Sequence, residues 1–413
     1  MEKTLNKTTV ISIIGMCYIG LPTATMFASK GFKVYGYDVN EEVINTLKKG
    51  EIHIVEPDLK ELFKTALESG NLIPTAEIKE SDVYIICVPT PFKEDHNEKL
   101  VDLTFVEGAS ETVAKVLKKG DLVILESTVP PETTDICMNS ILEKGSGLKV
   151  NVDYSIAHCP ERVLPGQILK ELRDNDRIIG VSDEKAGVLA KELYASIVTN
   201  GNIYITNSVT AEMCKLVENT FRDINIAFAN ELSMICDQLN VNVWELIQLA
   251  NKHPRVNILS PGAGVGGHCL AVDPWFIVEK FPELSKVIRA SREVNEYKPQ
   301  WVVEKAESEI KELFKEKDIT IGILGLAYKP NIDDLRESPS MKIAVTLKEK
   351  GYNVVACEPH CSKPVIKGIE NKTFDAVIRQ SDYIIYCVPH AQFVSEKDKL
   401  NDKTVLDVVG QFK

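Results

Sequence analysis

The strongest constraint on the fold of this chain is an internal repeat that links its two ends. Residues 10–22, VISIIGMCYIGLP, are echoed by residues 319–330, ITIGILGLAYKP, and each copy is a short β-branched run that ends in a glycine turn. Two further strand patterns recur in each half: KVYGYD at 33–38 with NVVACEP at 353–359, and SDVYIICVPT at 81–90 with SDYIIYCVPH at 381–390. Strands that alternate with helical segments predict a parallel α/β sheet. Two nucleotide-binding-like folds suit an enzyme that holds two nucleotide-containing molecules, one on each sheet.

Between the two repeats the chain is mainly helical. Residues 211–240 contain neither glycine nor proline, and their apolar residues recur at helical spacing: Leu216, Val217, Ile224, Phe228, Leu232 and Ile235. Further helical patterns cover 242–251 and roughly 284–316. We therefore expect two Rossmann-like, doubly wound parallel-sheet domains joined by a central helical domain with one long helix. The expected bounds are 1–210 for the first Rossmann-like domain, 211–317 for the central helical domain and 318–413 for the second Rossmann-like domain.

Composition excludes several classes of function. The 48 Lys and Arg against 60 Asp and Glu give a formal net charge of −12, which repels nucleic acid and anionic membrane surfaces. No window approaches the roughly 18 consecutive apolar residues of a membrane span. The ten cysteines show no paired spacing, which indicates a reducing cytoplasm. The nearest metal pattern, Cys357, His360 and Cys361, lacks a second ligand pair, so we expect no metal.

The first glycine turn has the features of a dinucleotide site. Gly15 and Gly20 lie between a strand and a helix, and Asp38 ends the next strand pattern, where a carboxylate binds a ribose 2′-hydroxyl and repels a 2′-phosphate. These features predict NAD rather than NADP. Cys17 stands where a second glycine normally lets the backbone approach the pyrophosphate. We place four further residues along the cofactor cleft: Tyr18, Ile19, Thr90 and Thr128.

A second glycine-rich segment, PGAGVGGHC at residues 261–269, presents a cysteine. Many glycines weaken any regular element, and their use here is to bring the backbone against a ligand and deliver Cys269 to it. Cys269 is therefore a candidate nucleophile, although a flexible loop beside a buried thiol would have the same sequence. His268 is not assigned as its base, because adjacent side chains diverge. Asp273 could orient a catalytic water or a lysine.

Three polar residues of the long helix, Lys215, Asn219 and Arg222, fall on one stripe and can reach one ligand together. A solvated helix face would have the same pattern. In the last α/β segment, Lys329 and Arg336 follow the glycine turn and are candidate anion ligands.

Taken together, these segments resemble the UDP-sugar 6-dehydrogenase family, the UDP-glucose/GDP-mannose 6-dehydrogenases, over nearly the whole chain. The matching motifs are 15–22, 127–131, 160–162, the Lys215/Asn219 helix, the glycine loop with Cys269 and Asp273, and 328–336. Within the family, residues 50–59, 159–166 and 264–276 are similar to the branch that acts on UDP-N-acetyl-D-mannosamine. The UDP-glucose branch carries a Ser-Cys-Phe type of sequence at the nucleophile. Two residues depart from the family pattern: Cys17, and Glu132, where glycine often follows the paired prolines.

The resemblance implies a four-electron oxidation of the sugar 6-hydroxyl to a carboxylate, with two NAD used in turn. Cys269 would add to the intermediate aldehyde, because a thiohemiacetal can release a second hydride and a free aldehyde cannot. The resulting thioester would then be hydrolysed. The same chemistry on UDP-N-acetylglucosamine or UDP-glucose stays an alternative, and so does a nucleotide-binding regulator without catalysis.

The resemblance also implies domain and residue roles: residues 1–210 would bind NAD, 211–317 would serve dimerisation and substrate binding, and 318–413 would bind UDP. Lys215 would be the acid/base or hold the oxyanion, Asn219 would donate beside it, and Glu161 and Thr128 would serve the water or proton steps. The UDP-sugar would be contacted by Arg162, Val163, Arg222, His253, Arg255, Gly266, Tyr328 and Lys329. Arg255 and Arg336 would reach across a subunit boundary, with Arg336 at the partner's cofactor, which predicts a homodimer or higher oligomer built on the long helix.

Overall fold

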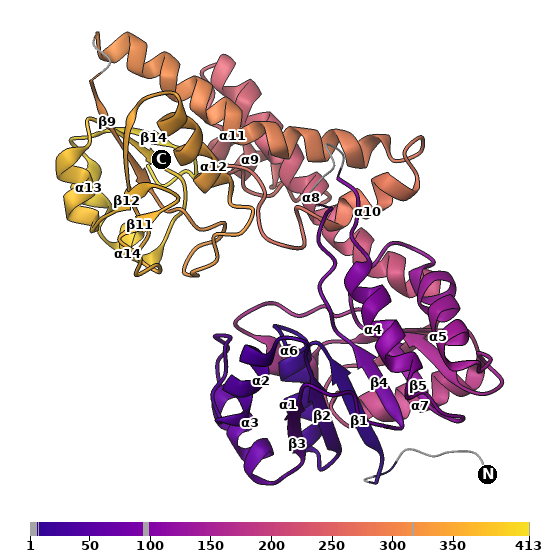
Figure 1. Ribbon diagram of the computed structural model, residues 1–413. Helices are drawn as coiled ribbons and strands as arrows, with labels where there is room; N and C mark the ends of the chain where they lie inside the picture. Colours follow the sequence, from indigo (N-terminus) through magenta and orange to yellow (C-terminus); the bar gives the residue numbers. More distant parts are fainter. Residues whose placement is uncertain (1–5, 7, 94–98, 316–317, 413) are drawn as a thin grey trace. The chain divides into compact units, whose positions relative to one another are not determined.

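The computed structural model describes residues 6, 8–93, 99–315 and 318–412 (Figure 1). The chain forms two compact units, Met1–Val217 and Glu218–Lys413. The expected helix end at 316, the domain boundary at 317 and the last residue of the chain lie outside the described residues. Among the helices of the described ranges, none combines the length and apolar character needed to cross a membrane.

The first unit is built on an eight-stranded sheet in the order β3-β2-β1-β4-β5-β6-β7-β8. Its strands are β1 (Val10–Ile14), β2 (Lys33–Tyr37), β3 (Leu72–Thr75), β4 (Val83–Ile86), β5 (Leu122–Leu125), β6 (Ser155–His158), β7 (Arg177–Val181) and β8 (Ile203–Thr206). The six strands from β3 to β6 are parallel. From β1 the chain first adds β2 and β3 on one side and then β4, β5 and β6 on the other, and such sheets bind nucleotides at this switch point between β1 and β4.

Helices cover both faces of this sheet. One face packs on α1 (Gly20–Ser29), α2 (Glu41–Lys48), α3 (Leu59–Glu68), α6 (Ile168–Asp174) and α7 (Glu184–Ala195). The other packs on α4 (Thr104–Ala114), the π-helix η1 (Thr133–Met138) and α5 (Asn139–Ser146). The central strands are buried on both sides, which explains their continuous apolar sequences.

The second unit contains a six-stranded sheet in the order β11-β12-β10-β9-β13-β14. Its strands are β9 (Thr320–Leu324), β10 (Asn353–Cys357), β11 (Val365–Ile366), β12 (Ile369–Asn371), β13 (Tyr383–Tyr386) and β14 (Thr404–Asp407). One face packs on α11 (Lys286–Leu313) and α12 (Pro339–Glu349), and the other on α13 (Phe374–Gln380), α14 (Ala391–Ser395) and η2 (Lys397–Leu400).

The expected fold, two doubly wound α/β sheets with a helical middle, is confirmed, with one correction at the sheet edges. β7 pairs with β6 in the antiparallel direction, and β11 pairs with β12 in the same way. Both sheets are therefore mixed. The sequence pattern does not reveal this, because strand direction depends on the connection and not on the strand.

The long helix α8 (Ser208–Gln238) begins three residues before the expected stretch and runs from the first unit into the second. The helices α9 (Val243–Ala250), α10 (Asp273–Lys280) and α11 belong to the second unit, and both α10 and α12 pack along α11 (Figure 1). In its second-unit part, α8 buries Asp223 and Asn230 and exposes Phe221 and Phe228. This is the reverse of an ordinary amphipathic helix.

Candidate active site

The first glycine turn leaves backbone exposed at the end of β1. Gly15 has φ of 95°, and a Cβ there would lie 2.6 Å from the carbonyl oxygen of Cys87. A Cβ at Gly20 would lie 1.8 Å from the carbonyl oxygen of Gly15. Only glycine therefore fits where α1 begins against the strand. Cys17 and Tyr18 are exposed on this turn, and Ile19 packs partly into the core.

Asp38 lies beside this turn, as the sequence predicts. Its carboxylate accepts hydrogen bonds from the backbone N–H of Met16 at 2.8 Å and of Asn40 at 2.9 Å. A carboxylate has about four acceptor positions, so two remain for ribose hydroxyls. The turn and Asp38 thus form a cradle whose donors and acceptor fit a dinucleotide.

The loops after β4 and β5 are joined near the predicted cofactor cleft. The Thr90 hydroxyl donates to the carbonyl oxygen of Thr128 at 2.8 Å, and the Ser127 hydroxyl donates to that of Val88 at 2.7 Å. Thr90 and Thr128 are thus neighbours, and both are partly exposed. The sequence places each of them in the cleft but does not reveal this direct bond.

Glu161 sits in a buried ionic cluster at the end of β6. It lies 2.9 Å from Arg177, and its other oxygen accepts from the backbone N–H of Arg162 at 2.7 Å. A second buried carboxylate, Glu126, lies 3.9 Å from the same guanidinium. Burial raises the pKa of Glu126, and Arg177 opposes this. One arginine thus faces two carboxylates, and Glu161 holds the direct contact.

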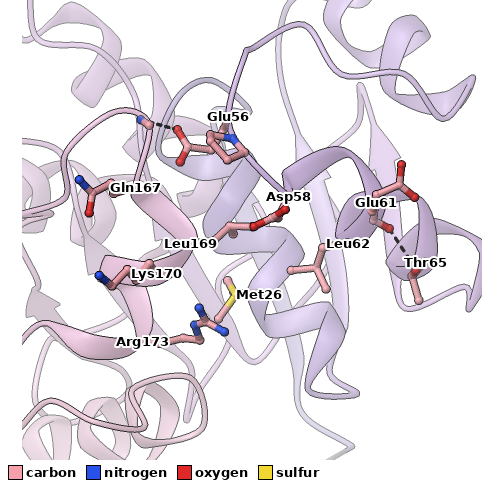
Figure 2. Close-up of a pocket in the computed structure, with 12 residues that line it drawn as sticks. Met26, Glu56, Asp58, Glu61, Leu62, Thr65, Gln167, Leu169, Lys170 and Arg173 are labelled. Atoms are coloured by element: carbon pink, nitrogen blue, oxygen red, sulfur yellow. Dashed lines mark hydrogen bonds between the residues drawn. The ribbon is translucent and has the colours of Figure 1, made fainter.

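The segment after Glu161 is fixed by Glu56, which sequence reasoning missed. The Glu56 carboxylate accepts from the backbone N–H of Gly166 at 2.8 Å and of Ile168 at 2.7 Å. It lies at one end of a cavity of about 560 Å³ between α3 and α6, with Lys170 and Arg173 at the other side (Figure 2). The loop that carries Arg162 and Val163 is therefore anchored at its far end.

In the second unit, Cys269 is exposed at the end of the glycine loop. Its carbonyl oxygen accepts from the backbone N–H of Val272 at 3.0 Å and of Asp273 at 2.8 Å, which forms a turn directly before α10. Asp273 is buried and accepts a hydrogen bond from the Asn219 side chain on α8. Three predicted catalytic residues thus come together in one unit.

The glycine loop lies against the second glycine turn. A Cβ at Gly266 would lie 2.6 Å from the Glu337 carbonyl oxygen and 2.7 Å from Tyr328 Cβ, and Gly267 donates to the carbonyl of Arg336 at 3.3 Å. The Arg336 guanidinium is held by two hydrogen bonds to Asp334, at 2.8 and 2.6 Å. Burial lowers the pKa of His268, and Arg336 adds to this effect.

The remaining predicted binding and catalytic residues differ in how exposed they are. Lys215 is buried on the first-unit part of α8, and Arg222 is exposed on the second-unit part. His253 and Arg255 lie exposed just after α9, where the Arg255 N–H donates to His253 Nδ1 at 3.3 Å. Lys329 is partly buried after Tyr328. The catalytic and binding roles of all these residues stay predictions. Within the described ranges, no cluster of three or more His, Cys, Asp or Glu could hold a metal ion.

Three family models match the chain in order. They are the NAD binding domain of the UDP-glucose/GDP-mannose dehydrogenase family at residues 9–198, its central domain at 209–297 and its UDP binding domain at 322–413. The chain belongs to the UDP-glucose/GDP-mannose dehydrogenase family. The family resemblance seen in the sequence is confirmed, and NAD is the cofactor of the first domain.

Relatives of this dehydrogenase family match over nearly their whole length. A UDP-N-acetyl-D-mannosamine dehydrogenase of Campylobacter jejuni is 48% identical, covering 96% of this chain and 99% of that protein. An NDP-N-acetyl-D-galactosaminuronic acid dehydrogenase of Ralstonia nicotianae is 46% identical, covering 97% and 96%. A solved structure of a UDP-D-ManNAc dehydrogenase from Pyrococcus horikoshii matches with a TM-score of 0.89 at 42% identity, covering 98% and 96%.

Sequence reasoning on this family member missed residues that hold other site residues or the site loops in place. Besides Glu56, these are Arg177, Asp334 and a buried polar cluster on α8 and α11. A signal was present for the cluster, because Asp223 and Asn230 interrupt the apolar pattern of α8 seven residues apart. For Glu56 the sequence holds no such signal, because its partners are more than a hundred residues away.

Proposed function

We propose that this chain oxidises UDP-N-acetyl-D-mannosamine at the sugar 6-hydroxyl to UDP-N-acetyl-D-mannosaminuronate, with two NAD per turnover. The observation that carries the proposal is the exposed Cys269, beside Asp273 and Asn219, on a glycine loop that lies against Tyr328. The names of the Campylobacter and Pyrococcus relatives support the choice of sugar.

The residues of the first turn fit NAD. Gly15 and Gly20 would let the pyrophosphate approach the backbone, and Asp38 would bind the adenosine ribose. Tyr18, Ile19, Thr90 and Thr128 would line the remaining cleft. When bound, NAD supplies the hydride acceptor for each of the two oxidations.

The side chains of this chain would carry the remaining chemistry. In the first oxidation Lys215 takes the hydroxyl proton or holds the oxyanion, and Asn219 donates beside it. The Cys269 thiol then adds across the aldehyde carbonyl: its sulfur forms the C–S bond as the C=O π bond opens, and the proton that the thiol loses ends on the oxygen as the hydroxyl of a thiohemiacetal. Loss of the second hydride and of that hydroxyl proton gives a thioester. Water, activated at Glu161 or Thr128 and oriented by Asp273, releases the carboxylate and regenerates the thiol.

The UDP-sugar would be held by basic and small residues. We assign Arg162, Val163, Arg222, His253 and Gly266 to the sugar and its phosphates, and Tyr328 and Lys329 to the uridine diphosphate. An anionic ligand needs such local cations, because the chain as a whole carries a charge of −12. A reduced Cys269 is also required, which is the reason to expect the enzyme in the cytoplasm.

We infer further that the enzyme is a homodimer built on α8. Three apolar side chains recur along the exposed side of this helix, Phe221, Phe228 and Ile235, and the exposed Leu239 follows directly after its end. An exposed apolar stripe of this kind is typical of an interface between copies. Arg255 and Arg336 would then act in the partner's site. The two hydrogen bonds from Arg336 to Asp334 support this role, because they fix the half-exposed Arg336 side chain.

The test of the reaction counts NADH per sugar. The purified protein is given NAD and, separately, the UDP derivatives of N-acetylmannosamine, N-acetylglucosamine, N-acetylgalactosamine and glucose. We expect the best turnover on the first, with two NADH per acid formed, and no acid from Cys269→Ala. Cys361→Ala is the control, because Cys361 is a partly buried thiol of the same unit, in the segment between β10 and β11. Best turnover on another sugar rejects the substrate, one NADH rejects the thiol mechanism, and none rejects the enzyme.

The test of the dimer mixes two inactive variants. If Arg336 acts across the boundary, co-expressed Cys269→Ala and Arg336→Ala chains form a heterodimer with one intact site. Random pairing then restores about a quarter of wild-type activity. Failure of the mixture to exceed either variant alone rejects the exchange of Arg336, and a monomer in sedimentation rejects the dimer.

A further inference from the structure

A buried polar cluster joins α8 to α11 in the second unit. Its four members are Asp223 and Asn230 on α8 and Arg292 and Asn295 on α11, each at most 1% exposed. Arg292 donates to Asp223 Oδ1 at 2.6 Å, and Asn295 Nδ2 donates to the same oxygen at 2.8 Å. Asn230 Nδ2 donates to Asn295 Oδ1 at 2.9 Å. The four side chains therefore form one continuous hydrogen-bonded chain.

This cluster reaches both ends of the glycine loop. At the start of the loop, the Gly262 N–H donates to Asn230 Oδ1 at 2.9 Å. At the other end, Arg292 Nη1 lies 3.5 Å from the carbonyl oxygen of Leu270, the residue after Cys269. Between them, a Cβ at Gly264 would lie 3.1 Å from the carbonyl oxygen of Asn295, so the loop rests directly on α11.

The direction of every hydrogen bond in the cluster is determined. Because Asn230 Oδ1 accepts from Gly262, its amide nitrogen must face Asn295 Oδ1, and the Asn295 nitrogen must then face Asp223. The chain of donors ends on a carboxylate whose charge Arg292 balances. Neither amide can rotate by 180° without breaking two bonds, so the loop start is held in one position.

Folding stability alone does not call for such a cluster. A buried ion pair is often no more stabilising than apolar residues of the same volume, because both charges lose their hydration. Here Asp223 Oδ2 and Arg292 Nε also have no hydrogen-bond partner among the described residues. The glycine loop, in contrast, has little rigidity of its own. A fixed polar support therefore serves the position of the loop more than the stability of the two helices.

We propose that Asp223, Asn230, Arg292 and Asn295 are positioning residues that hold the Cys269 thiol in place for addition to the aldehyde, and so control the second oxidation more than the first. The proposal rests on the proposed function. The first hydride leaves an alcohol and needs no thiol, whereas the second leaves only after the C–S bond has formed. Misplacement of a reacting group by about 1 Å is enough to lower a rate about 100-fold.

The test replaces the ion pair by apolar residues of similar size, Asp223→Leu with Arg292→Met. The matched control is Asp237→Leu with Lys305→Met, which removes the 2.6 Å ion pair between the same two helices at a place away from the loop. Arg292→Lys is the second variant, because it keeps the charge and loses the planar guanidinium, whose Nη1 reaches Asp223 and Leu270 and whose Nη2 reaches Glu296. The readouts are NADH per sugar consumed, aldehyde captured by hydroxylamine, the KM for UDP-sugar and the rate of Cys269 alkylation by iodoacetamide.

We expect the cluster variants to oxidise the alcohol with a KM within about twofold of wild type, and to convert the aldehyde about 10- to 100-fold more slowly. NADH per sugar falls from two towards one, aldehyde appears in the trap, and the alkylation rate of Cys269 changes. The Asp237/Lys305 control keeps two NADH. Two outcomes in the folded cluster variants overturn the positioning role alone. One is an equal loss of both oxidations, and the other is two NADH per sugar with an unchanged rate of Cys269 alkylation. A wild-type enzyme that makes fewer than two NADH overturns the proposed function together with it.

Discussion

The two sheets begin with the same local geometry and then diverge. Gly15 and Gly325 both have positive φ, of 95° and 87°, and both donate to the carbonyl at the end of the neighbouring strand, Tyr37 at 2.9 Å and Cys357 at 3.0 Å. A carboxylate follows that strand in each unit, Asp38 in the first and Glu358 in the second. The difference lies in what comes after the turn.

In the first unit α1 begins at Gly20, directly after the turn, whereas in the second α12 begins only at Pro339. A helix N-terminus that follows the strand so closely is the arrangement that binds pyrophosphate. In the second unit the intervening residues instead carry Tyr328 and Arg336, which lie against the glycine loop. A duplicated strand and turn therefore does not duplicate the binding site.

Asp38 and Glu358 also differ in whether they keep acceptor positions for a ligand. Glu358 is 1% exposed and accepts from the backbone N–H of Leu326 at 2.7 Å and of Ala327 at 2.8 Å, with His390 Nε2 at 3.2 Å. Because His390 Nδ1 accepts from the Asn331 N–H, its proton lies on Nε2 and points to Glu358. Glu358 therefore closes the second turn, while Asp38 has one bond to its turn, from Met16, and keeps acceptor positions for a ligand.

The largest expected effect comes from a substitution five residues after the first glycine of the turn, at Gly20 in the first unit, compared with Pro330 in the second. Gly20→Ala places a Cβ 1.8 Å from the Gly15 carbonyl oxygen, so the turn must move. We expect a loss of about 3 kcal/mol in unfolding free energy and a fall of about 100-fold or more in NAD affinity. Pro330→Ala, at the corresponding place in the second turn, should leave NAD affinity unchanged. Titration with NAD and urea unfolding measure both.

Gly108→Ala controls for the added methyl group in the first unit. No heavy atom lies within 4 Å of a Cβ there, and Gly108 is inside α4, so we expect a gain of about 0.5–1 kcal/mol. Wild-type NAD affinity in Gly20→Ala would show that the close approach is not needed, and would remove the main contrast between the turns.

The next effect comes from neutralising the two carboxylates. Asp38→Asn should weaken NAD by about tenfold, which is the value of one charge-assisted hydrogen bond of about 1.5 kcal/mol. Glu358→Gln should leave NAD affinity unchanged and destabilise the second unit by about 1–3 kcal/mol, because the buried donors lose a charged acceptor and one carboxylate oxygen becomes an NH2 donor. All three tryptophans, Trp244, Trp275 and Trp301, belong to the second unit, so tryptophan fluorescence in urea reports its unfolding.

Glu358→Gln should also change how the stability of the second unit depends on pH. Burial raises the pKa of Glu358, but the hydrogen bond from His390 and those from Leu326 and Ala327 outweigh it and hold the pKa below its ordinary value. A depressed carboxyl pKa stabilises the folded state at pH above the ordinary value of about 4.3, and this stabilisation is lost as pH falls through the folded value. Wild type should therefore lose second-unit stability in acid more steeply than Glu358→Gln. Parallel acid profiles would contradict the role given to Glu358.

The contrast between the turns also shows what the sequence can predict. The strands, the turns and Asp38 follow from local patterns, because glycine after a β-branched run and an acid after the next strand are signals within one βαβ unit. The sequence cannot show that α12 begins late, because residues 326–338 contain no pattern that excludes a helix start near Gly325. Nor can it show that β7 runs antiparallel to β6.

Site residues follow the same rule. Glycine spacing and helix spacing are local patterns, so they single out Cys269, Asp273 and Asn219 as candidates, whose catalytic roles stay predictions. The pairing of Asp223 with Arg292, 69 residues apart, and of Glu56 with Gly166, 110 residues apart, depends on which helices pack together. Such contacts are set by tertiary packing, so the sequence could name candidate reactive residues but could not name the residues that support them.

The smallest expected effect concerns a strained glutamate in each unit. Glu132 follows the loop of Thr128 with φ of 73°, and Glu337 follows the second turn with φ of 48°, a region that disfavours residues with a Cβ. Glu132→Gly relieves about 1 kcal/mol of backbone strain in the folded state. It also raises the conformational entropy of the unfolded chain, which costs a similar or smaller free energy, so we expect the unfolding free energy to rise by about 0.5 kcal/mol. Glu111→Gly, inside α4, should instead lose about 1 kcal/mol. Far-UV circular dichroism in urea follows both units and tryptophan fluorescence follows the second alone, since the first has no tryptophan, so the two signals together give the unfolding of the first unit. A loss on Glu132→Gly would mean that the contacts of Glu132 outweigh its backbone strain, and Glu337→Gly would then show whether the second unit differs.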